Sequence, residues 1–133
     1  MQEEASAHIE DNIITGNLLA NIAFGGLFSE NTIIVNNVIK HGCLEGIFVV
    51  ESGQCIISRN RIEENLDGIV VATAIPIISK NTILRNKSNG IVALLRSEPL
   101  LQNNIIKFNR GVGLFVRDRC IVKLEGGNII KKN

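Results

Sequence analysis

The sequence predicts an all-β protein, a right-handed single-stranded parallel β-helix of five to six coils with about 23 residues per coil. Three observations support this fold class. The motif Asn-x-Ile recurs six times, at intervals of 25, 23, 21, 23 and 24 residues. The chain holds 22 Ile, a strand-forming residue, and 16 Asn, a turn residue, against 12 Leu. No helical period of apolar residues is found along the chain.

The repeats align on the consensus Ile-x-x-Asn-x-Ile-x-x-Asn-x-x-x-Gly-Ile-x-Val. Its first Asn is expected to form one ladder of stacked side chains, made of Asn12, Asn37, Asn60, Asn81, Asn104 and Asn128. Its second Asn is expected to form another ladder, which includes Asn65, Asn86 and Asn109. We predict both ladders at bends, because Asn tolerates a left-handed backbone and stacked amides can hydrogen-bond from coil to coil.

Each coil is expected to contain three short strands. The first strand precedes the first Asn, and its inward residues are Ile9, Ile34, Ile57, Ile78 and Leu101. The second strand lies between the two Asn residues, with Ile39, Ile62, Ile83 and Ile106 pointing inward. The third strand is the Gly-Ile-x-Val block, with Ile47, Ile69, Ile91 and Leu114 in the interior. Alternation then points the residue after each of these four outward.

Two copies depart from the consensus. In the first coil, residues 21–24 replace the Gly-Ile-x-Val block, and a loop insertion is expected near residues 25–30. In the last coil, one extra glycine at 126–127 places Leu124 in the inner position of the first strand. We expect residues 1–133 to form one β-helix segment of a longer protein, because no capping helix is evident and the chain ends in mid-repeat.

Leucine-rich repeats share the Ile-x-x-Asn-x-Ile piece and are the main alternative. Three features favour the β-helix. Leu is scarcer than Ile, and Pro76 and Pro99 fall where a leucine-rich strand needs backbone donors. The second half of each repeat is a β-branched strand pattern and not a helical one.

Composition excludes several classes of protein. The net charge is +1, which does not indicate a generally basic nucleic-acid binder. No apolar run approaches the length of a transmembrane helix, and the acidic N-terminus lacks the apolar stretch of a secretory signal. Cys43, Cys55 and Cys120 are too few and too scattered for a disulfide framework. We therefore expect an intracellular protein with no membrane partner.

Residues 60–71 (Asn-Arg-Ile-Glu-Glu-Asn-Leu-Asp-Gly-Ile-Val-Val) and 74–81 (Ala-Ile-Pro-Ile-Ile-Ser-Lys-Asn) resemble the parallel β-helix repeats of pectin-lyase-like proteins. Their residue pattern is most similar to the repeats of the β-helix F-box proteins and the SHC-binding, spindle-associated proteins. The resemblance covers about residues 7–133. It implies substrate capture for ubiquitylation in the first group and a protein or carbohydrate contact surface in the second. No F-box motif is present in this sequence.

Catalysis is not expected from the outward positions of the third strand. Enzymes that resemble this fold carry acidic or basic catalytic groups on one outer sheet, whereas these positions are nearly uncharged. Glu63, Glu64 and Asp67 adjoin on one bend and are predicted to be surface charges. His8 and His41 have no acidic or Cys neighbour at metal-ligand spacing. We predict no catalytic residue, no metal site and no cofactor.

The candidate partner-binding surface is the outward apolar ladder of the third strand. Its residues are Phe48, Val70, Val92 and Phe115, flanked by Leu94 and Arg117. A contiguous exposed apolar patch is typical of a contact surface, although another part of a longer chain or a second copy could cover it. The outer or inner side of Ile33, Ile56, Ile77 and Leu100 is left open by the pattern.

Charge is distributed unevenly along the chain. Residues 1–79 carry a net charge of −7 and residues 80–133 a net charge of +8. Because coils stack in sequence order, one end of the rod should be acidic and the other basic. This polarity could steer an acidic partner or favour head-to-tail self-association through the open ends. Nucleic acid is disfavoured, because the basic coils lack interleaved aromatic residues apart from Phe108 and Phe115.

The function predicted from the sequence is non-catalytic protein recognition. The β-helix would be the substrate- or partner-binding region of an intracellular F-box-type ubiquitin ligase or a related scaffold. A carbohydrate-binding or carbohydrate-active β-helix fragment is the first alternative, and a structural spacer is the second. The absence of Trp and Tyr weighs against sugar binding, since sugars stack on amphipathic rings.

Overall fold

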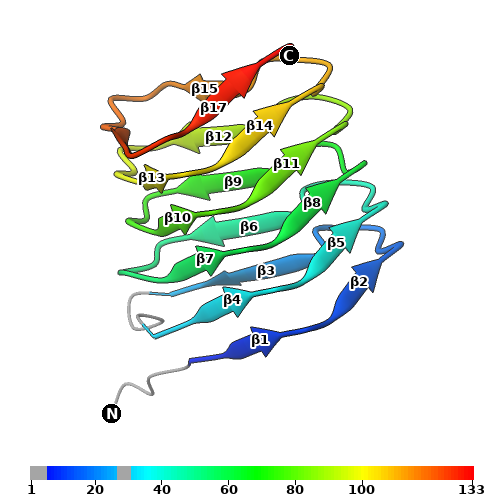
Figure 1. Cartoon of the computed structure of the whole chain (residues 1–133). Coiled ribbons are helices and arrows are strands. Elements are labelled where there is room, and N and C mark those ends of the chain that lie inside the picture. Colours follow the sequence, from blue (N-terminus) through cyan, green and yellow to red (C-terminus); the bar gives the residue numbers. More distant parts are fainter. Residues whose placement is uncertain (1–5, 27–30) are drawn as a thin grey trace.

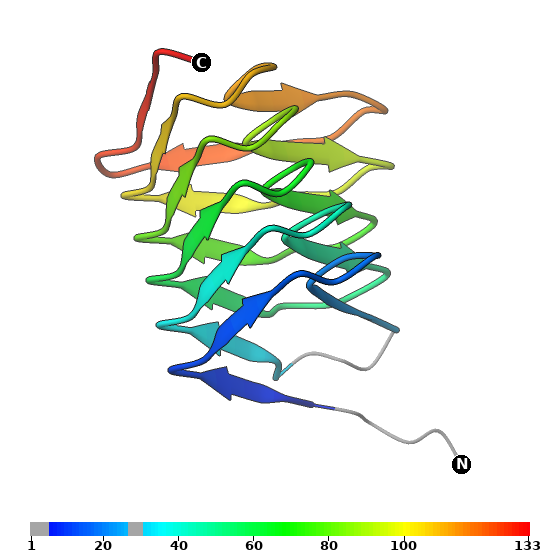
Figure 2. The same ribbon diagram turned by 90° about the vertical axis from the view of Figure 1, so that its right-hand side faces the viewer.

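The computed structural model describes residues 6–26 and 31–133 of the chain, and in these residues every regular element is a β-strand. The chain winds through three parallel sheets, once per coil, from the N-terminal coil at one end to the C-terminal coil at the other (Figures 1 and 2). Each strand pairs with the strands three places earlier and later in the chain. The predicted parallel β-helix is confirmed.

The three sheets, here called A, B and C, take one strand each from successive coils. Sheet A contains β1 (His8–Glu10), β4 (Ile33–Val35), β7 (Ile56–Ser58), β10 (Ile77–Ser79), β13 (Leu100–Gln102) and β16 (Lys123–Glu125). Sheet B contains β2 (Ile13–Thr15), β5 (Val38–Lys40), β8 (Arg61–Glu63), β11 (Thr82–Leu84), β14 (Ile105–Lys107) and β17 (Ile129–Lys131). Sheet C contains β3 (Ile22–Gly25), β6 (Ile47–Val50), β9 (Ile69–Ala72), β12 (Ile91–Leu94) and β15 (Leu114–Val116).

The register of the irregular copies follows the repeat. In the first coil, Ile22 pairs with Ile47, so residues 21–24 do take the place of the Gly-Ile-x-Val block. Gly25 still belongs to β3, and the last four residues of the predicted insertion, 27–30, lie outside the described residues. In the last coil, Leu124 pairs with Leu101, so the extra glycine is absorbed before the sixth strand of sheet B begins.

The core consists of stacked aliphatic side chains, one or two from each of strands β1 to β15. The fully buried members are Ile34, Ile39, Ile47, Val49, Ile57, Ile62, Ile69, Val71, Ile78, Ile83, Ile91, Ala93, Leu101 and Ile106. Cys55 joins this core at the position that Pro76 and Pro99 occupy in later coils, as a small buried filler. Because each coil repeats the same pattern, the core is a continuous column along the rod axis.

The corners are built by left-handed residues, and here the structure corrects the sequence prediction. The ladder Asn residues were expected to adopt the left-handed backbone, but in most coils the residue before the ladder position does so instead. Before Asn128 the left-handed residue is Gly126, and in the second coil the left-handed His41 precedes Gly42. Between sheets A and B these residues are Asp11, Asn36, Arg59, Lys80 and Asn103, with φ of 55–58°. Between sheets B and C they are Gly16, His41, Glu64, Arg85, Phe108 and Lys132, with φ of 52–74°. The Asn side chains stabilise these corners by hydrogen bonding.

The ladder Asn residues connect neighbouring coils by hydrogen bonds. In the first ladder, the backbone N–H of each Asn donates to the Oδ1 of the Asn in the next coil at 2.9–3.0 Å. The Nδ2 of Asn81 then donates to the carbonyl oxygen of Ile57 in the preceding coil at 2.9 Å. In the second ladder, Asn65, Asn86 and Asn109 are buried and bonded in the same way. Among the described residues, no buried side-chain nitrogen or oxygen lacks a hydrogen-bond partner.

A row of glycines lies beside the second Asn ladder. The row contains Gly46, Gly68, Gly90 and Gly113. A Cβ on Gly68 would lie 2.5 Å from the carbonyl oxygen of Gly90 and 2.6 Å from Cγ2 of Ile83. These positions therefore require glycine because neighbouring coils approach too closely for any side chain.

Candidate functional site

The predicted partner-binding residues lie on the outer face of sheet C. The pairing register brings Phe48, Val70, Val92 and Phe115 into one line across four coils, and these four residues are here called the sheet-C stripe. Their strand neighbours Ile47 and Ile91 lie in the core, as alternation along a strand requires.

The middle of the sheet-C stripe is much less accessible than predicted. Val70 and Val92 are each only 6% exposed, whereas Phe115 is 40% exposed and Phe48 is half-buried. Dense packing of neighbouring coils at strand spacing leaves short Val side chains little open surface between longer ones. Apolar contact area on this face is therefore provided by Phe48, Phe115 and the half-buried Leu94.

The last predicted residue of this group, Arg117, follows the end of β15 and is exposed. Its Nε lies 3.3 Å from Oδ2 of Asp118, the next residue in the chain. An exposed pair of this kind contributes little to stability and leaves the guanidinium accessible.

Sheet A carries a second apolar line that the sequence left unassigned. Ile33, Ile56, Ile77 and Leu100 pair in register and point outward, opposite to the fully buried residue that follows each of them. These four residues are here called the sheet-A stripe. Ile56 is 40% exposed and the other three are half-buried. The sheet-A stripe thus offers more continuous aliphatic surface than the sheet-C stripe.

Two shallow hollows run alongside the sheet-A stripe. One, of about 160 Å³, includes Ile33, Ile56 and Ile77 in its wall. The other, of about 210 Å³, includes Ile77 and Leu100, and both share Gln54. On the other side, the next outward residues of the strands include the small polar side chains of Ser58 and Ser79, whose hydroxyls lie 3.1 Å apart. The stripe therefore has an aliphatic centre with a polar margin.

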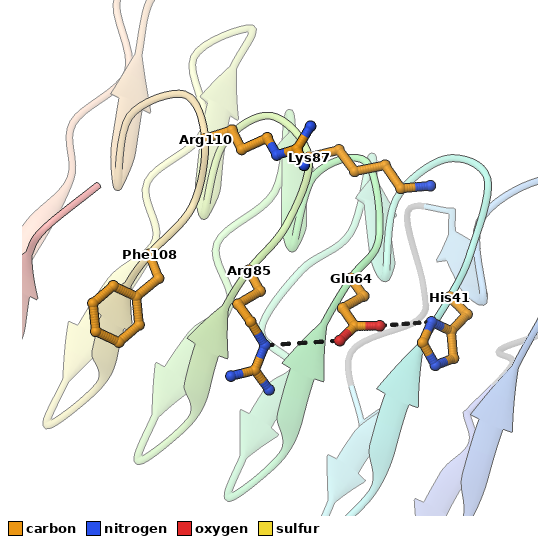
Figure 3. A pocket seen from close by; sticks show the side chains of 6 residues that line it. All are labelled: His41, Glu64, Arg85, Lys87, Phe108 and Arg110. Atoms are coloured by element: carbon orange, nitrogen blue, oxygen red, sulfur yellow. Dashed lines mark ion pairs between the residues drawn. The ribbon is translucent and has the colours of Figure 1, made fainter.

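The corner between sheets B and C forms a separate, charged groove. It has a volume of about 410 Å³ and is lined by His41, Glu64, Arg85, Lys87, Phe108 and Arg110. Four of these are the left-handed corner residues of successive coils, and they form a row along the rod (Figure 3). Lys87 and Arg110 lie above this row, two residues further along the chain in the fourth and fifth coils (Figure 3). These six residues are here called the corner groove.

Ion pairs connect the acidic part of the corner groove. The Nδ1 of His41 lies 2.9 Å from Oε2 of Glu64, and the Nε of Arg85 lies 3.7 Å from the other oxygen of that carboxylate. Arg85 also donates through Nη2 to Oε2 of Glu63 at 2.6 Å, and Arg61 lies 3.0 Å from the same oxygen. Glu64 and Arg85 are thus already paired within the protein.

Glu63 was expected to be a surface charge, and this expectation was wrong. The residue is 8% exposed, because it is the last residue of β8 and both Arg side chains lie over it. Desolvation by itself would raise the pKa of Glu63, but the hydrogen bonds and charges of Arg61 and Arg85 outweigh it and lower the pKa below its usual range. Glu63 is therefore a structural anion that holds neighbouring coils together.

One comparison with known proteins decides the family. The family model described as "Right handed beta helix region" matches residues 1–133, the whole chain. The chain belongs to the right-handed β-helix family. Neither a curated protein nor a solved structure shows significant similarity to it. This β-helix family membership establishes the fold and leaves function to be argued from the surface.

Each of the two histidines of this β-helix lies beside one carboxylate. His8 lies 3.1 Å from Glu10, and His41 pairs with Glu64, 23 residues away and in the next coil. In the part of the chain that the structure describes, no three His, Cys, Asp or Glu side chains converge in a way that could hold a metal ion. No helix among residues 6–26 and 31–133 is long and apolar enough to cross a membrane.

The corner groove was missed at the level of sequence. Its row residues occupy the same repeat position, directly before the second ladder position, which holds Gly42 after His41 and Asn after the other three, but they share no chemical type. A search for recurring residue types therefore passes over them. Aligning the copies and comparing the position before the second Asn would have placed His41, Glu64, Arg85 and Phe108 side by side.

Proposed function

We propose that this β-helix is a non-catalytic protein-recognition module whose partner binds the outer face of sheet A. The sheet-A stripe carries the proposal, because it presents one aliphatic side chain from each of four successive coils in register. Coils lie at the strand spacing of about 4.8 Å, so these side chains form an unbroken apolar strip. A contiguous apolar strip on a water-facing surface is typical of a contact site.

The surroundings of the stripe support a protein partner. Protein interfaces combine an apolar centre with a polar margin that remains partly hydrated. Here the half-buried Ser79 and Gln102 provide such a margin, and the two hollows beside Ile77 can accept side chains of the partner. The sheet-C stripe, with Phe48 and Phe115, is a second and smaller contact face in this proposal.

The wider setting we propose is the substrate- or partner-binding region of an intracellular F-box-type ubiquitin ligase or a related scaffold. The support is the resemblance of residues 60–81 to the repeats of the β-helix F-box proteins. Cys43, Cys55 and Cys120 are free thiols, which suits a reducing compartment.

Affinity capture from cell lysate with quantitative mass spectrometry tests the proposal. Wild type is compared with Ile56→Lys/Ile77→Glu, which places an opposite-charge pair on the sheet-A stripe without changing net charge. The matched control is Ile105→Lys/Thr82→Glu, at paired outward positions of sheet B. Circular dichroism and thermal melts first establish that all three proteins are folded.

We expect specific proteins to be retained by wild type and by the control and to be lost from the sheet-A variant. A parallel variant, Phe48→Asp/Phe115→Asp, should reduce capture to a smaller extent. If the sheet-A variant captures the same proteins as wild type, recognition by this face is excluded. Glycan-array binding by both proteins would then favour the carbohydrate alternative.

A further inference from the structure

Two cations of the corner groove are unused by the fold. Arg85 forms ion pairs with Glu63 and Glu64, and His41 pairs with Glu64. Lys87 and Arg110 are exposed, and neither forms an ion pair with any residue that the structure describes. They project from successive coils on the same side of the groove (Figure 3). Two unpaired cations held side by side by a rigid scaffold are suited to carboxylate recognition.

The aromatic residue of the groove stands out in a different way. Phe108 is 46% exposed and adopts the left-handed backbone, with φ of 58°. A bulky side chain is unfavourable in that backbone region, and the equivalent corner of the first coil has Gly16. Lys107 lies over the ring, with its Nζ 5.3 Å from the centroid. The left-handed backbone is shared by the other corner residues of this row, so the exposed ring is the feature that marks Phe108 as an apolar contact residue.

We propose that the corner groove binds an acidic peptide segment of the protein partner. Carboxylates of the segment lie between Lys87 and Arg110, and a neighbouring apolar side chain of the segment rests on Phe108. This inference rests on the proposed recognition function and adds the chemistry of one partner segment. The acidic segment is also steered toward these coils, because residues 80–133 carry a net charge of +8.

The groove also restricts what can bind. Glu64 lies between His41 and Arg85, in the part of the row nearer the N-terminus (Figure 3). A ligand with evenly spaced negative charges, such as single-stranded nucleic acid, would bring a phosphate against this carboxylate. An acidic peptide can avoid that repulsion by placing a neutral residue there. The arrangement therefore favours a short acidic segment over a uniform polyanion.

Fluorescence anisotropy with a labelled Glu-Glu-Phe-Glu-Glu peptide tests the proposal. The groove variant is Lys87→Glu/Arg110→Glu. The matched control is Lys123→Glu/Lys131→Glu, which changes net charge equally in the same basic part of the chain, residues 80–133. Phe108→Asn is a third variant, because Asn tolerates the left-handed backbone better than Phe and should not destabilise the fold. A peptide with Gln in place of Glu measures the contribution of the carboxylates to binding, and a peptide with Ala in place of Phe measures the contribution of the aromatic side chain.

We expect the groove variant to weaken peptide binding by about tenfold or more and the control to change it by about twofold or less. Phe108→Asn should weaken binding by about threefold with an unchanged or higher melting temperature. The Ile56→Lys/Ile77→Glu variant should bind the peptide as wild type does, so failure of the groove and failure of the sheet-A stripe are distinguishable. Equal binding by the groove variant and the control, or no binding by wild type at about 1 mM peptide, overturns the inference. Tighter binding of a single-stranded RNA oligonucleotide that depends on Lys87 and Arg110 also overturns it.

Discussion

Asn21 occupies the space that the missing side chain of Gly42 leaves open. Its Nδ2 donates to Oδ1 of Asn65 at 2.8 Å and to the carbonyl oxygen of Lys40 at 3.1 Å. A Cβ on Gly42 would lie 2.8 Å from that same Nδ2. In the other coils the second ladder position holds Asn and the position before the third strand holds Gly. Here the first coil has Asn21 in the glycine position, and the second coil has Gly42 in the Asn position that contacts it. The amide of Asn21 therefore fills the space that the second-ladder amide would fill.

This exchange predicts a strong coupling between the two positions. Asn21→Gly should lower the free energy of unfolding by about 1–3 kcal/mol, because it removes two hydrogen bonds between coils and leaves a void beside Gly42. Gly42→Asn alone should destabilise the protein by about 1–3 kcal/mol through overpacking against Asn21. The double variant restores the arrangement of later coils and should be more stable than either single variant. Urea denaturation of all four proteins measures the coupling, and strict additivity would contradict the exchange.

The glycine row gives a second prediction about stability. Gly68→Ala should lower the free energy of unfolding by about 3 kcal/mol, because the new methyl group meets the backbone of the next coil. Gly16→Ala is the control. Gly16 has a φ of 74°, and a methyl group added there would have no atom within 4 Å, so only backbone strain of about 1 kcal/mol applies. Equal losses for both variants in thermal or urea unfolding would show that close approach is not what requires glycine at 68.

The strand positions were predictable because every coil repeats the same residue types in the same order. Registers such as Ile57 with Ile78 follow from aligning the copies, and even the extra glycine before Asn128 could be placed. The left-handed residues were not predictable in the same way. A recurring Asn can indicate either tolerance of the left-handed backbone or a role in amide hydrogen bonding. At the ladders only the hydrogen bonding applies, and the sequence does not distinguish the two.

The candidate sites were less predictable than the fold. Outward residues such as Ile56 are followed by an aliphatic residue that points inward. Polar–apolar alternation therefore did not show whether the residues of the sheet-A stripe point into the core or toward solvent. Contacts between coils, such as His41 with Glu64 or Arg85 with Glu63, depend on side-chain length and direction at a corner. A repeat alignment places these residues in the same or adjacent columns, but it does not show which of them pair or become buried.

Thiol reactivity should separate the three cysteines. Burial raises the pKa of Cys55 to about 12, with a hydrogen bond to Ser52 opposing the shift in part. Cys43 is exposed, and Cys120 is half-buried with its Sγ 3.2 Å from Oγ of Ser97. Alkylation with iodoacetamide at about pH 8, followed by peptide mass spectrometry, should modify Cys43 first and Cys55 only after unfolding, because the thiolate is the nucleophile. Modification of Cys55 at the same rate as Cys43 under native conditions would show that the second and third coils open.

Glu63 should make the stability of the protein depend on pH. Its pKa is lower in the folded state than the ordinary value of 4.5, although desolvation opposes the shift, because Arg61 and Arg85 stabilise the carboxylate. A group with a depressed folded-state pKa binds protons more readily when the protein is unfolded. Its contribution is therefore fully present above the unfolded pKa and is lost as pH falls through the folded pKa.

Glu63→Gln removes this contribution and tests the assignment. At pH 7 the variant should be less stable by about 1 kcal/mol, a modest value because both Arg side chains are nearly half exposed. The difference from wild type should shrink as pH falls below the ordinary range of a Glu pKa, where the wild-type carboxylate also becomes neutral. Glu125→Gln, at an exposed carboxylate of sheet A that accepts a hydrogen bond from Gln102, is the control and should change stability little at any pH. Urea unfolding at several pH values measures both, and a stability difference for Glu63→Gln that does not vary with pH would show that the charge of this carboxylate does not stabilise the corner.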